Sequence, residues 1–484
     1  MAEEVNYKKL RLTCGLEIHQ QLDTESKLFC YCSTEMKERE PIKIIKRKQH
    51  PVASELGEVD TAAQFEFLRN RIFSYQTFRN ETCLVDLDEE PPHSLNPEAL
   101  KIALQIALLL NCEIPNEIHI MRKIVIDGSN TSGFQRTAVV GLNGKMKYKG
   151  REIEITSVSL EEDAAAIVKE DGENITYRLN RLGVPLVEIG TGLLENYTPR
   201  EIQDIAFNIG MICRSTEKVK RGIGTIRQDV NVSIRGGKRV EMKGVQDLSL
   251  LAKVVELEVK RQISLPKVEE ETRAVNEDGT TKYIRPLPGS ARMYPETDTH
   301  PISLQKEFVE KMKKELPEPW TKKLVRFQSK YRLSEDLAKQ IIRSEHLEFF
   351  EKIVDETKAP GTIVANFFIS TIKDLEKREK VELNRLREEH YIDLFENIAK
   401  GRIVKEAIPV IIKFLSEKPG ETANSAIKEL NLEPLNVSDL KKVIEEVLKP
   451  GLTYEKAVGI VMSKVRGRIE AEVVMQQVKK LIKS

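Results

Sequence analysis

Apolar and polar side chains alternate over residues 12–21, and this alternation predicts a β-strand with two different faces. The apolar face carries Leu12, Cys14, Leu16 and Ile18. The polar face carries Glu17, His19 and Gln21. A carboxylate and an imidazole on a strand suited to burial cost free energy unless a partner satisfies them. A divalent cation would satisfy both, because both are common metal ligands. The alternative is a half-exposed strand whose polar groups are simply solvated.

The composition describes an ordinary globular chain. Its 484 residues are 40% hydrophobic and 32% charged with a net charge of +1, so we expect two to four domains and only local nucleic-acid-binding patches. No signal peptide and no apolar run of membrane-spanning length is apparent, which predicts a cytoplasmic protein with no membrane partner. Six scattered cysteines indicate reduced thiols. Cys30 and Cys32 have no second pair nearby, so a four-ligand zinc site is not expected.

The texture of the sequence changes near residue 300 and predicts an α+β fold with three domains. Residues 1–300 mix strand-like runs with helices, which we expect over Pro97–Asn111 and Pro199–Arg214. Beyond Pro301 glycine is rare and helical periodicity dominates, which predicts an all-helical domain over 301–415. A helical tail domain over 416–484 follows the hinge at Lys418-Pro-Gly-Glu, with its last segment beginning at Lys449-Pro-Gly-Leu-Thr453.

The last segment is locally basic. Residues 450–484 contain seven Lys or Arg against three Glu, and three of the cations lie close together at Lys464, Arg466 and Arg468. A basic helical tail suits contact with a phosphate backbone, and a solvated surface helix explains the charge equally well.

Three further segments place carboxylates on strand-like runs. The first ends in Leu160-Glu-Glu162, the second is Gly183–Gly190 with Glu188 near its end, and the third is a hairpin over residues 225–243. A three-residue loop at 236–238 would set Ile234 opposite Val240 and sort the hairpin into an apolar and a polar face. The polar face then carries Arg227, Asp229, Asn231, Ser233, Glu241 and Lys243.

Carboxylates from four strands repel one another unless cations separate them. Two magnesium ions bridged by nucleotide phosphates would supply the charge, with Lys and Arg available for developing negative charge. The alternative is that the four faces never meet. The sequence contains no G-x-x-x-x-G-K-[ST] loop, so any ATP is bound by a fold without a P-loop.

Several of these stretches resemble the B/E family of tRNA-dependent amidotransferase subunits. They are Gly15-Leu-Glu-Ile-His19, Lys27-Leu-Phe-Cys30, Leu160-Glu-Glu-Asp-Ala164, Asn180–Ile189, Ile226–Asn231 and Ala457–Arg468. Others resemble the archaeal E branch rather than the bacterial B branch: Pro51–Val59, Cys83–Pro92, Asp127–Gln135, Gly279–Gly289 and Met293–Asp298.

The resemblance implies an antiparallel-sheet cradle that acts as a kinase, followed by helical and tail domains that grip tRNA. It implies ATP- and Mg²⁺-dependent phosphorylation of the glutamate carried by Glu-tRNA(Gln), and amidation by ammonia from an asparaginase-like D subunit in a D2E2 assembly. Carried over by position, the magnesium and catalytic residues are Glu17, His19, Glu162, Glu188 and Asp229. The cofactor-binding residues are Arg227, Asn231, Glu241 and Lys243, and Lys464, Arg466 and Arg468 bind tRNA.

One feature departs from the resemblance. The E branch usually carries an insertion resembling an aspartyl-tRNA synthetase domain, but here Val259–Lys267 leads directly into Glu271-Thr-Arg273. Two alternatives remain open. One is a B subunit with an amidase partner, acting on Glu-tRNA(Gln) and Asp-tRNA(Asn). The other is a non-catalytic tRNA-binding scaffold.

Overall fold

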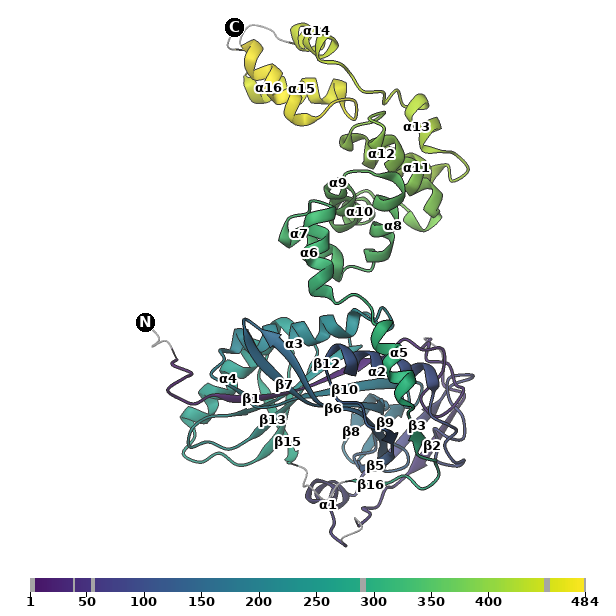
Figure 1. The fold of residues 1–484 in the computed structure, drawn as a ribbon, viewed down its shortest axis with the longest axis vertical. Helices are drawn as coiled ribbons and strands as arrows, with labels where there is room; N and C mark the ends of the chain where they lie inside the picture. Colours follow the sequence, from purple (N-terminus) through teal and green to yellow (C-terminus); the bar gives the residue numbers. More distant parts are fainter. Residues whose placement is uncertain (1–4, 38–39, 54–56, 288–292, 448–452, 483–484) are drawn as a thin grey trace. The chain divides into compact units, whose positions relative to one another are not determined.

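The computed structural model describes residues 5–37, 40–53, 57–287, 293–447 and 453–482. Parts of two stretches named above, residues 54–56 and 288–289, lie outside the described residues, as do residues 449–452 of the expected start of the last segment. The chain divides into two compact units, Met1–Pro319 and Trp320–Ser484. The first is built on sheets and the second on helices, so the α+β prediction is confirmed (Figure 1).

One large sheet organises the first unit. Its strand order is β15-β14-β13-β12-β1-β10-β7-β6-β5-β16, with the short β11 paired to β1. All of its pairs are antiparallel except β13 with β14. The strands are β1 Thr13–Gln21, β5 Ile120–Ile124, β6 Phe134–Tyr148, β7 Arg151–Glu162, β10 Pro185–Thr191, β11 Leu194–Glu195, β12 Ile226–Ser233, β13 Val240–Val245, β14 Glu271–Val275, β15 Thr281–Pro286 and β16 Met293–Pro295.

Helices cover the apolar face of this sheet. They are α2 Pro97–Leu109, α3 Pro199–Arg214 and α4 Leu251–Ser264, which follows the short 3₁₀ turn Leu248–Leu250 (Figure 1). The predicted apolar residues of β1 are all buried in one core with these helices. Burial of that face leaves the opposite, polar face without a helical cover from α2, α3 or α4.

Local capping explains why two helices begin where the sequence predicts. Asn96 accepts hydrogen bonds from the backbone N–H groups of Glu98 and Ala99 at the start of α2. At α3, Thr198 and Glu201 form a reciprocal capping box before Pro199 at the first turn. The prediction for α3 is therefore confirmed at both ends, and α2 ends two residues before the predicted Asn111.

The predicted register of the β12–β13 hairpin is wrong by two residues. Asn231 lies opposite Glu241 and Val232 opposite Val240, and a bulge follows between Gln228 and Val230. The loop is longer than expected because pairing ends at Ser233 and Val240, with Gly236 at a φ of +81°. Since two residues is the period of a strand, this error leaves every side chain on the predicted face.

Smaller elements flank the main sheet. A four-stranded sheet, β2-β3-β9-β8, packs Phe73, Tyr75, Ile175 and Tyr177 into its own core. Its strands are β2 Lys43–Arg47, β3 Ile72–Thr77, β8 Ala166–Asp171 and β9 Asn174–Arg178, and β4 Glu117–Ile118 pairs separately with β17 Ile302–Ser303. Helix α1, Thr61–Leu68, follows β2 along the chain.

Helix α5, Lys306–Lys314, belongs to the first unit. Its Met312 is buried in the main core, with Val309 and Ile302 packed against that core. The compact units consequently divide between Pro319 and Trp320, whereas the sequence places the domain boundary between residues 300 and 301.

The second unit is helical throughout the part that the structure describes. Its α-helices are α6 Trp320–Lys330, α7 Glu335–Arg343, α8 Leu347–Thr357, α9 Gly361–Asn366, α10 Ile372–Lys377, α11 Glu388–Ala399, α12 Ile408–Glu417, α13 Ala423–Glu429, α14 Val437–Val447, α15 Tyr454–Val465 and α16 Ala471–Ile482. A π-helical turn at Phe367–Thr371 joins α9 to α10, and 3₁₀ turns lie at Leu383–Arg385 and Lys405–Ala407.

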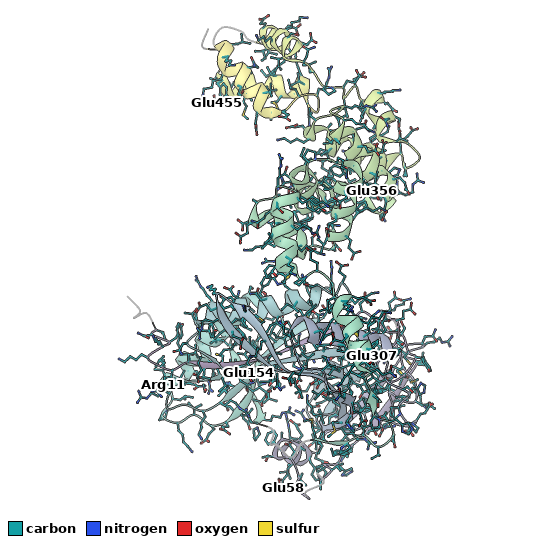
Figure 2. All side chains as sticks on the ribbon, viewed as in Figure 1. Arg11, Glu58, Glu154, Glu307, Glu356 and Glu455 are labelled. Carbon is teal, nitrogen blue, oxygen red and sulfur yellow. The ribbon has the colours of Figure 1, made fainter. Side chains whose placement is uncertain are left out.

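Two separate cores hold these helices. Aromatic rings pack through α6 to α11, among them Phe327, Phe350, Phe367 and Phe395. Helices α14 to α16 form their own aliphatic core around Leu440, Ile444, Val461 and Val474. Charged side chains such as Glu356 on α8 and Glu455 on α15 lie on the outside (Figure 2). Among the described residues, no helix combines the length and apolar character needed to cross a membrane.

We expect Phe327→Ala to lower the free energy of unfolding of the helical unit by about 3–5 kcal/mol, because a fully buried ring would leave a cavity against Tyr331 and Phe350. Thermal and denaturant unfolding measure the loss. Val325→Ala is the matched control on the same helix, since Val325 is 64% exposed. Equal destabilisation by the two variants would contradict the packing described.

Candidate active site

The polar face of the main sheet gathers side chains from five neighbouring strands. On β1, His19 lies opposite Glu188 of β10 on one side and opposite Arg227 of β12 on the other. Glu17 lies opposite Asp229 of β12, and Asn231 continues the row to Glu241 of β13. Directly opposed residues in antiparallel strands share a face, so strand pairing alone brings these groups together.

The first cluster joins His19, Glu161 and Glu188. One ligand atom from each lies within 4.8 Å of the others. His19 Nε2 and Glu188 Oε2 are 3.1 Å apart, and Lys123 Nζ lies 2.8 Å from Glu161 Oε1 and 3.2 Å from Glu188 Oε2. Thr137 Oγ1 donates a further hydrogen bond of 2.9 Å to Glu161. These partners fix the direction of both carboxylates.

The second cluster joins Glu17, Asp229 and Glu241, again with one oxygen of each within 4.8 Å of the others. Lys243 Nζ lies 3.0 Å from Asp229 and 3.1 Å from Glu241. The backbone N–H of Gly244 also donates to Asp229, and Asn231 Nδ2 donates to Glu17. Because Glu17 and His19 are two residues apart on one strand, the Cα atoms that anchor the two clusters are separated by about 7 Å.

Burial and charge act in opposite directions on the pKa values of these carboxyl groups. Burial raises the pKa of Glu17, the Glu188 carboxylate raises it further, and Lys243 lowers it. Burial also opposes ionisation of Asp229, but Lys243 and His19 hold its pKa at about 2. For Glu188, Lys123 and the bond to His19 outweigh burial and hold the pKa well below its ordinary value. The face therefore keeps crowded carboxylates ionised.

Arg227 lies behind the two clusters rather than between them. Its guanidinium is 3.2 Å from Asp163, a fully buried carboxylate that also accepts a 2.6 Å hydrogen bond from Gln21. Burial opposes ionisation of Asp163, but Arg227 and Arg181 lower its pKa. Arg227 is thus a cation whose orientation is set by a second, buried pair.

Glu162, one of the sequence-predicted metal ligands, lies apart from both clusters. It is the alternate residue on β7, so its side chain points away from the polar face, where Arg136 contacts it from β6. Arg136 also pairs with the buried Glu296 at 2.8 Å. The structure brings Glu161 to the clusters in its place.

Sequence reasoning missed two members of the site, Glu161 and Lys123. The signal for Glu161 was present in the β7 sequence, because alternation from Ser159 leads to Glu161 and not to Glu162. Lys123 lies on β5, two strands away from β7 in the sheet, and no local pattern marks it. The remaining eight sequence-predicted site residues from the first unit lie together on the one face.

Both clusters fit a divalent cation. An imidazole with two carboxylates, and a set of three carboxylates, are donor sets that such ions accept. Within the described residues, the buried Nδ1 of His19 has no hydrogen-bond partner, while its Nε2 points into the first cluster. Glu17 with its raised pKa would be relieved by added positive charge.

We expect Arg136→Met to destabilise the first unit by about 3–5 kcal/mol, because the variant leaves the buried Glu162 without its cation. Denaturant unfolding at neutral pH measures the change. Lys149→Met is the control, since Lys149 forms an exposed pair with Glu201 and should lose no measurable stability. A wild-type midpoint for Arg136→Met would contradict a structural role for the Arg136–Glu162 pair.

Two protein-family models match this chain. The GatB/GatE catalytic domain matches residues 12–310, which contain both clusters, and the GatB domain matches residues 348–482. The chain is also similar to curated proteins named as the E subunit of glutamyl-tRNA(Gln) amidotransferase. The protein from Methanocaldococcus jannaschii is 34% identical, with 99% of this chain and 100% of the relative covered. The one from Aeropyrum pernix is also 34% identical, with 99% and 98% covered.

The alignment to the Methanocaldococcus jannaschii protein spans 629 positions, against 484 residues here. The relative therefore has a substantial segment without a counterpart in this chain. The short connection between α4, which ends at Ser264, and β14, which begins at Glu271, agrees with the missing insertion expected there. The chain belongs to the GatB/GatE family of amidotransferase subunits, as a member of the E branch that lacks this insertion.

Proposed function

We propose that this chain catalyses ATP-dependent conversion of Glu-tRNA(Gln) to Gln-tRNA(Gln). The observation that carries the proposal is the pair of three-ligand clusters on one sheet face, each joined to a lysine. Two Mg²⁺ ions held there, one by His19, Glu161 and Glu188 and one by Glu17, Asp229 and Glu241, would neutralise the phosphates of ATP and polarise the transferred group.

The reaction has two balanced steps. A γ-carboxylate oxygen of the tRNA-bound glutamate attacks the terminal phosphorus of ATP, and the bond to the bridging oxygen breaks to release ADP. Ammonia then attacks the carbonyl carbon of the acyl phosphate, the carbon–oxygen bond breaks, and inorganic phosphate leaves with loss of a proton. Positioning and charge stabilisation supply most of the rate enhancement in phosphoryl transfer.

The protein's own residues prepare this face before any ligand binds. Lys123 and Lys243 orient the two sets of carboxylates and keep them ionised. Asn231 holds Glu17, and the Asp163 carboxylate holds Arg227. Lys243 and Arg227 are then available for the negative charge that develops on the transferred phosphoryl group.

The ammonia must come from a partner, because the sequence carries no amidase or asparaginase signature. We propose an asparaginase-like D subunit in a D2E2 assembly. A B subunit would instead use an amidase-like partner and also act on Asp-tRNA(Asn). The relatives of the E branch favour the former, and co-purification with either type of partner distinguishes them. A non-catalytic scaffold is disfavoured by the two fully formed clusters, because crowded carboxylates have no structural benefit.

We expect Glu161→Gln to reduce ATP-dependent formation of γ-phosphoryl-glutamyl-tRNA by at least about 100-fold, because it removes a charged oxygen from the first cluster. Trapping of the acyl phosphate with hydroxylamine measures this step without the ammonia-producing partner, and tRNA binding should persist.

Glu162→Gln is the matched control, with the same chemical change on the adjacent residue of β7. It should lose stability through Arg136 but retain phosphorylation in the folded fraction. The reverse result, activity in Glu161→Gln and none in Glu162→Gln, would return Glu162 to the metal site and reject the assignment of Glu161.

The C-terminal tail is proposed to bind the tRNA backbone. Lys464 and Arg466 are exposed at the end of α15, and Lys464 has only a 3.8 Å pair with Glu446. Arg468 is less free, because its Nε donates to the Glu433 carbonyl. Gly467, at a φ of +75°, makes the turn that separates the two arginines.

Neutralising Lys464, Arg466 and Arg468 to Gln should weaken tRNA binding and reduce the slope of log K against log salt by about 1 for each phosphate that the tail no longer neutralises. Filter binding over a salt series measures both. Lys441→Gln with Lys442→Gln removes exposed charge from α14 of the same core and serves as the control. An unchanged slope in the triple variant would make the tail a solvated helix.

A further inference from the structure

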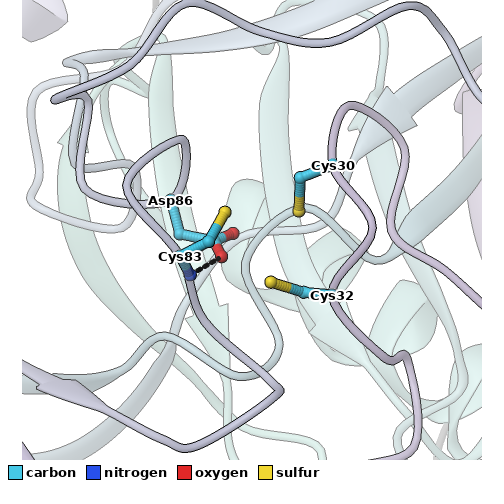
Figure 3. Close-up of side chains that lie close together, drawn as sticks. All are labelled: Cys30, Cys32, Cys83 and Asp86. Atoms are coloured by element: carbon cyan, nitrogen blue, oxygen red, sulfur yellow. Dashed lines mark hydrogen bonds between the residues drawn. The ribbon is translucent and has the colours of Figure 1, made fainter.

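Three cysteines and one aspartate converge at a place remote from the polar face in sequence and in ligand type. The sulfur atoms of Cys30, Cys32 and Cys83 and a carboxylate oxygen of Asp86 all lie within 4.8 Å of one another (Figure 3). All three thiols are free, and Cys30, Cys32 and Asp86 are buried. The three sulfur atoms point toward a common centre (Figure 3).

The cluster joins two irregular loops rather than two regular elements. Cys30 and Cys32 lie in a tight turn closed by the hydrogen bond from the Lys27 N–H to the Cys32 carbonyl, and Tyr31 between them is 85% exposed. Cys83 and Asp86 lie in a second turn, where the Cys83 N–H donates to Asp86 Oδ2 at 2.9 Å. Each turn thus presents its ligand atoms toward the other.

Apolar packing gives little reason for the two loops to meet. The buried cluster at their contact consists of Cys30, Cys32 and Val85, with Cys83 packed against it, and it is separate from the main core. It contains no large side chain. A set of small side chains on loops supplies little hydrophobic stabilisation, and such contacts are commonly held by a metal or a disulfide.

Asp86 adds a charge that thiols alone do not explain. Its Oδ1 pairs with the fully buried Lys27 at 3.0 Å, and Lys27 also donates to the Leu179 carbonyl. This pair already balances its own charge and fixes the carboxylate against the sulfur atoms. Neutral thiols donate weakly, so they offer a carboxylate poor compensation for burial.

We propose that Cys30, Cys32 and Cys83 bind a structural Zn²⁺ ion, with Asp86 as the fourth ligand. Each thiol loses its proton to solvent as its sulfur–zinc bond forms. Tetrahedral coordination with zinc–sulfur distances of about 2.3 Å sets sulfur atoms roughly 3.8 Å apart, so the limit of 4.8 Å requires only a small contraction. The sequence spacing argued against zinc because it counted Cys30 and Cys32 alone, whereas the third and fourth ligands come from a distant loop.

The ion would brace residues that support the polar face. Asp86 and Cys30 line a hollow of about 10 Å³ together with Phe29, Arg136 and Glu162. Thr131 Oγ1 donates to the Asp86 carbonyl at 2.7 Å, and the Phe29 ring lies 5.7 Å from the Arg136 guanidinium. This zinc is a structural ion with closed coordination, and it rests on geometry independent of the proposed magnesium sites.

Metal analysis of the full chain tests the proposal. After gel filtration of protein expressed with added zinc, plasma mass spectrometry should find about one zinc per chain, and Co²⁺ exchanged into the site should show the intense d–d bands of a tetrahedral thiolate site. Cys30→Ala and Cys83→Ala should each lose the zinc. Cys213→Ala is the control, because Cys213 is buried on α3 outside the cluster, and it should retain the zinc.

A second measurement needs no variant and so does not depend on folding. Alkylation of the native chain, mapped by mass spectrometry, should leave Cys30, Cys32 and Cys83 protected until a chelator is added, while the labelling of Cys112 stays constant. A zinc-free chain, equal zinc in the Cys30 and Cys213 variants, or labelling unaffected by the chelator would overturn the proposal. A disulfide among the three cysteines without metal would also overturn it.

Discussion

The crowding of negative charge on one face of the main sheet is the constraint on which the site depends. Six ligand residues, five of them carboxylates, come from five strands, and they can stay ionised together only because cations lie among them. Lys123 and Lys243 each contact two carboxylates, and each cluster has one of them. A face arranged in this way stores affinity for added positive charge, which is what a nucleotide-bound cation supplies.

The same strands that carry this charge also carry the core. Alternation sends Leu16 and Ile18 under α2, α3 and α4 and sends Glu17 and His19 to the opposite face, so fold and site share one register. A slip by one residue would bury the carboxylates and expose the core, whereas a slip by two would preserve both faces. The β12–β13 hairpin shows the second case, since the predicted pairing differs from the observed one by two residues.

The two kinds of proposed metal site stabilise different parts of the first unit. The polar face uses oxygen-rich donors on regular strands, where backbone hydrogen bonds hold the ligands in place. The cysteine cluster lies on irregular loops with a very small core, where metal ligation would replace packing. Arg136 and Glu162 lie between these regions, because they contact the loop hollow on one side and continue β6 and β7 on the other. Glu162 is therefore a supporting residue rather than a ligand.

Local sequence patterns were sufficient to predict the α+β class, the ends of α3, the two faces of β1 and most residues of the polar face, because these depend on periodicity and capping. Tertiary contacts were needed to show that Glu161 replaces Glu162, that Lys123 joins the first cluster, and that α5 packs on the first unit. Folding likewise brings Cys83 and Asp86 to Cys30 and Cys32. These outcomes depend on contacts between segments far apart in the chain, and local periodicity carries no information about which distant segments meet.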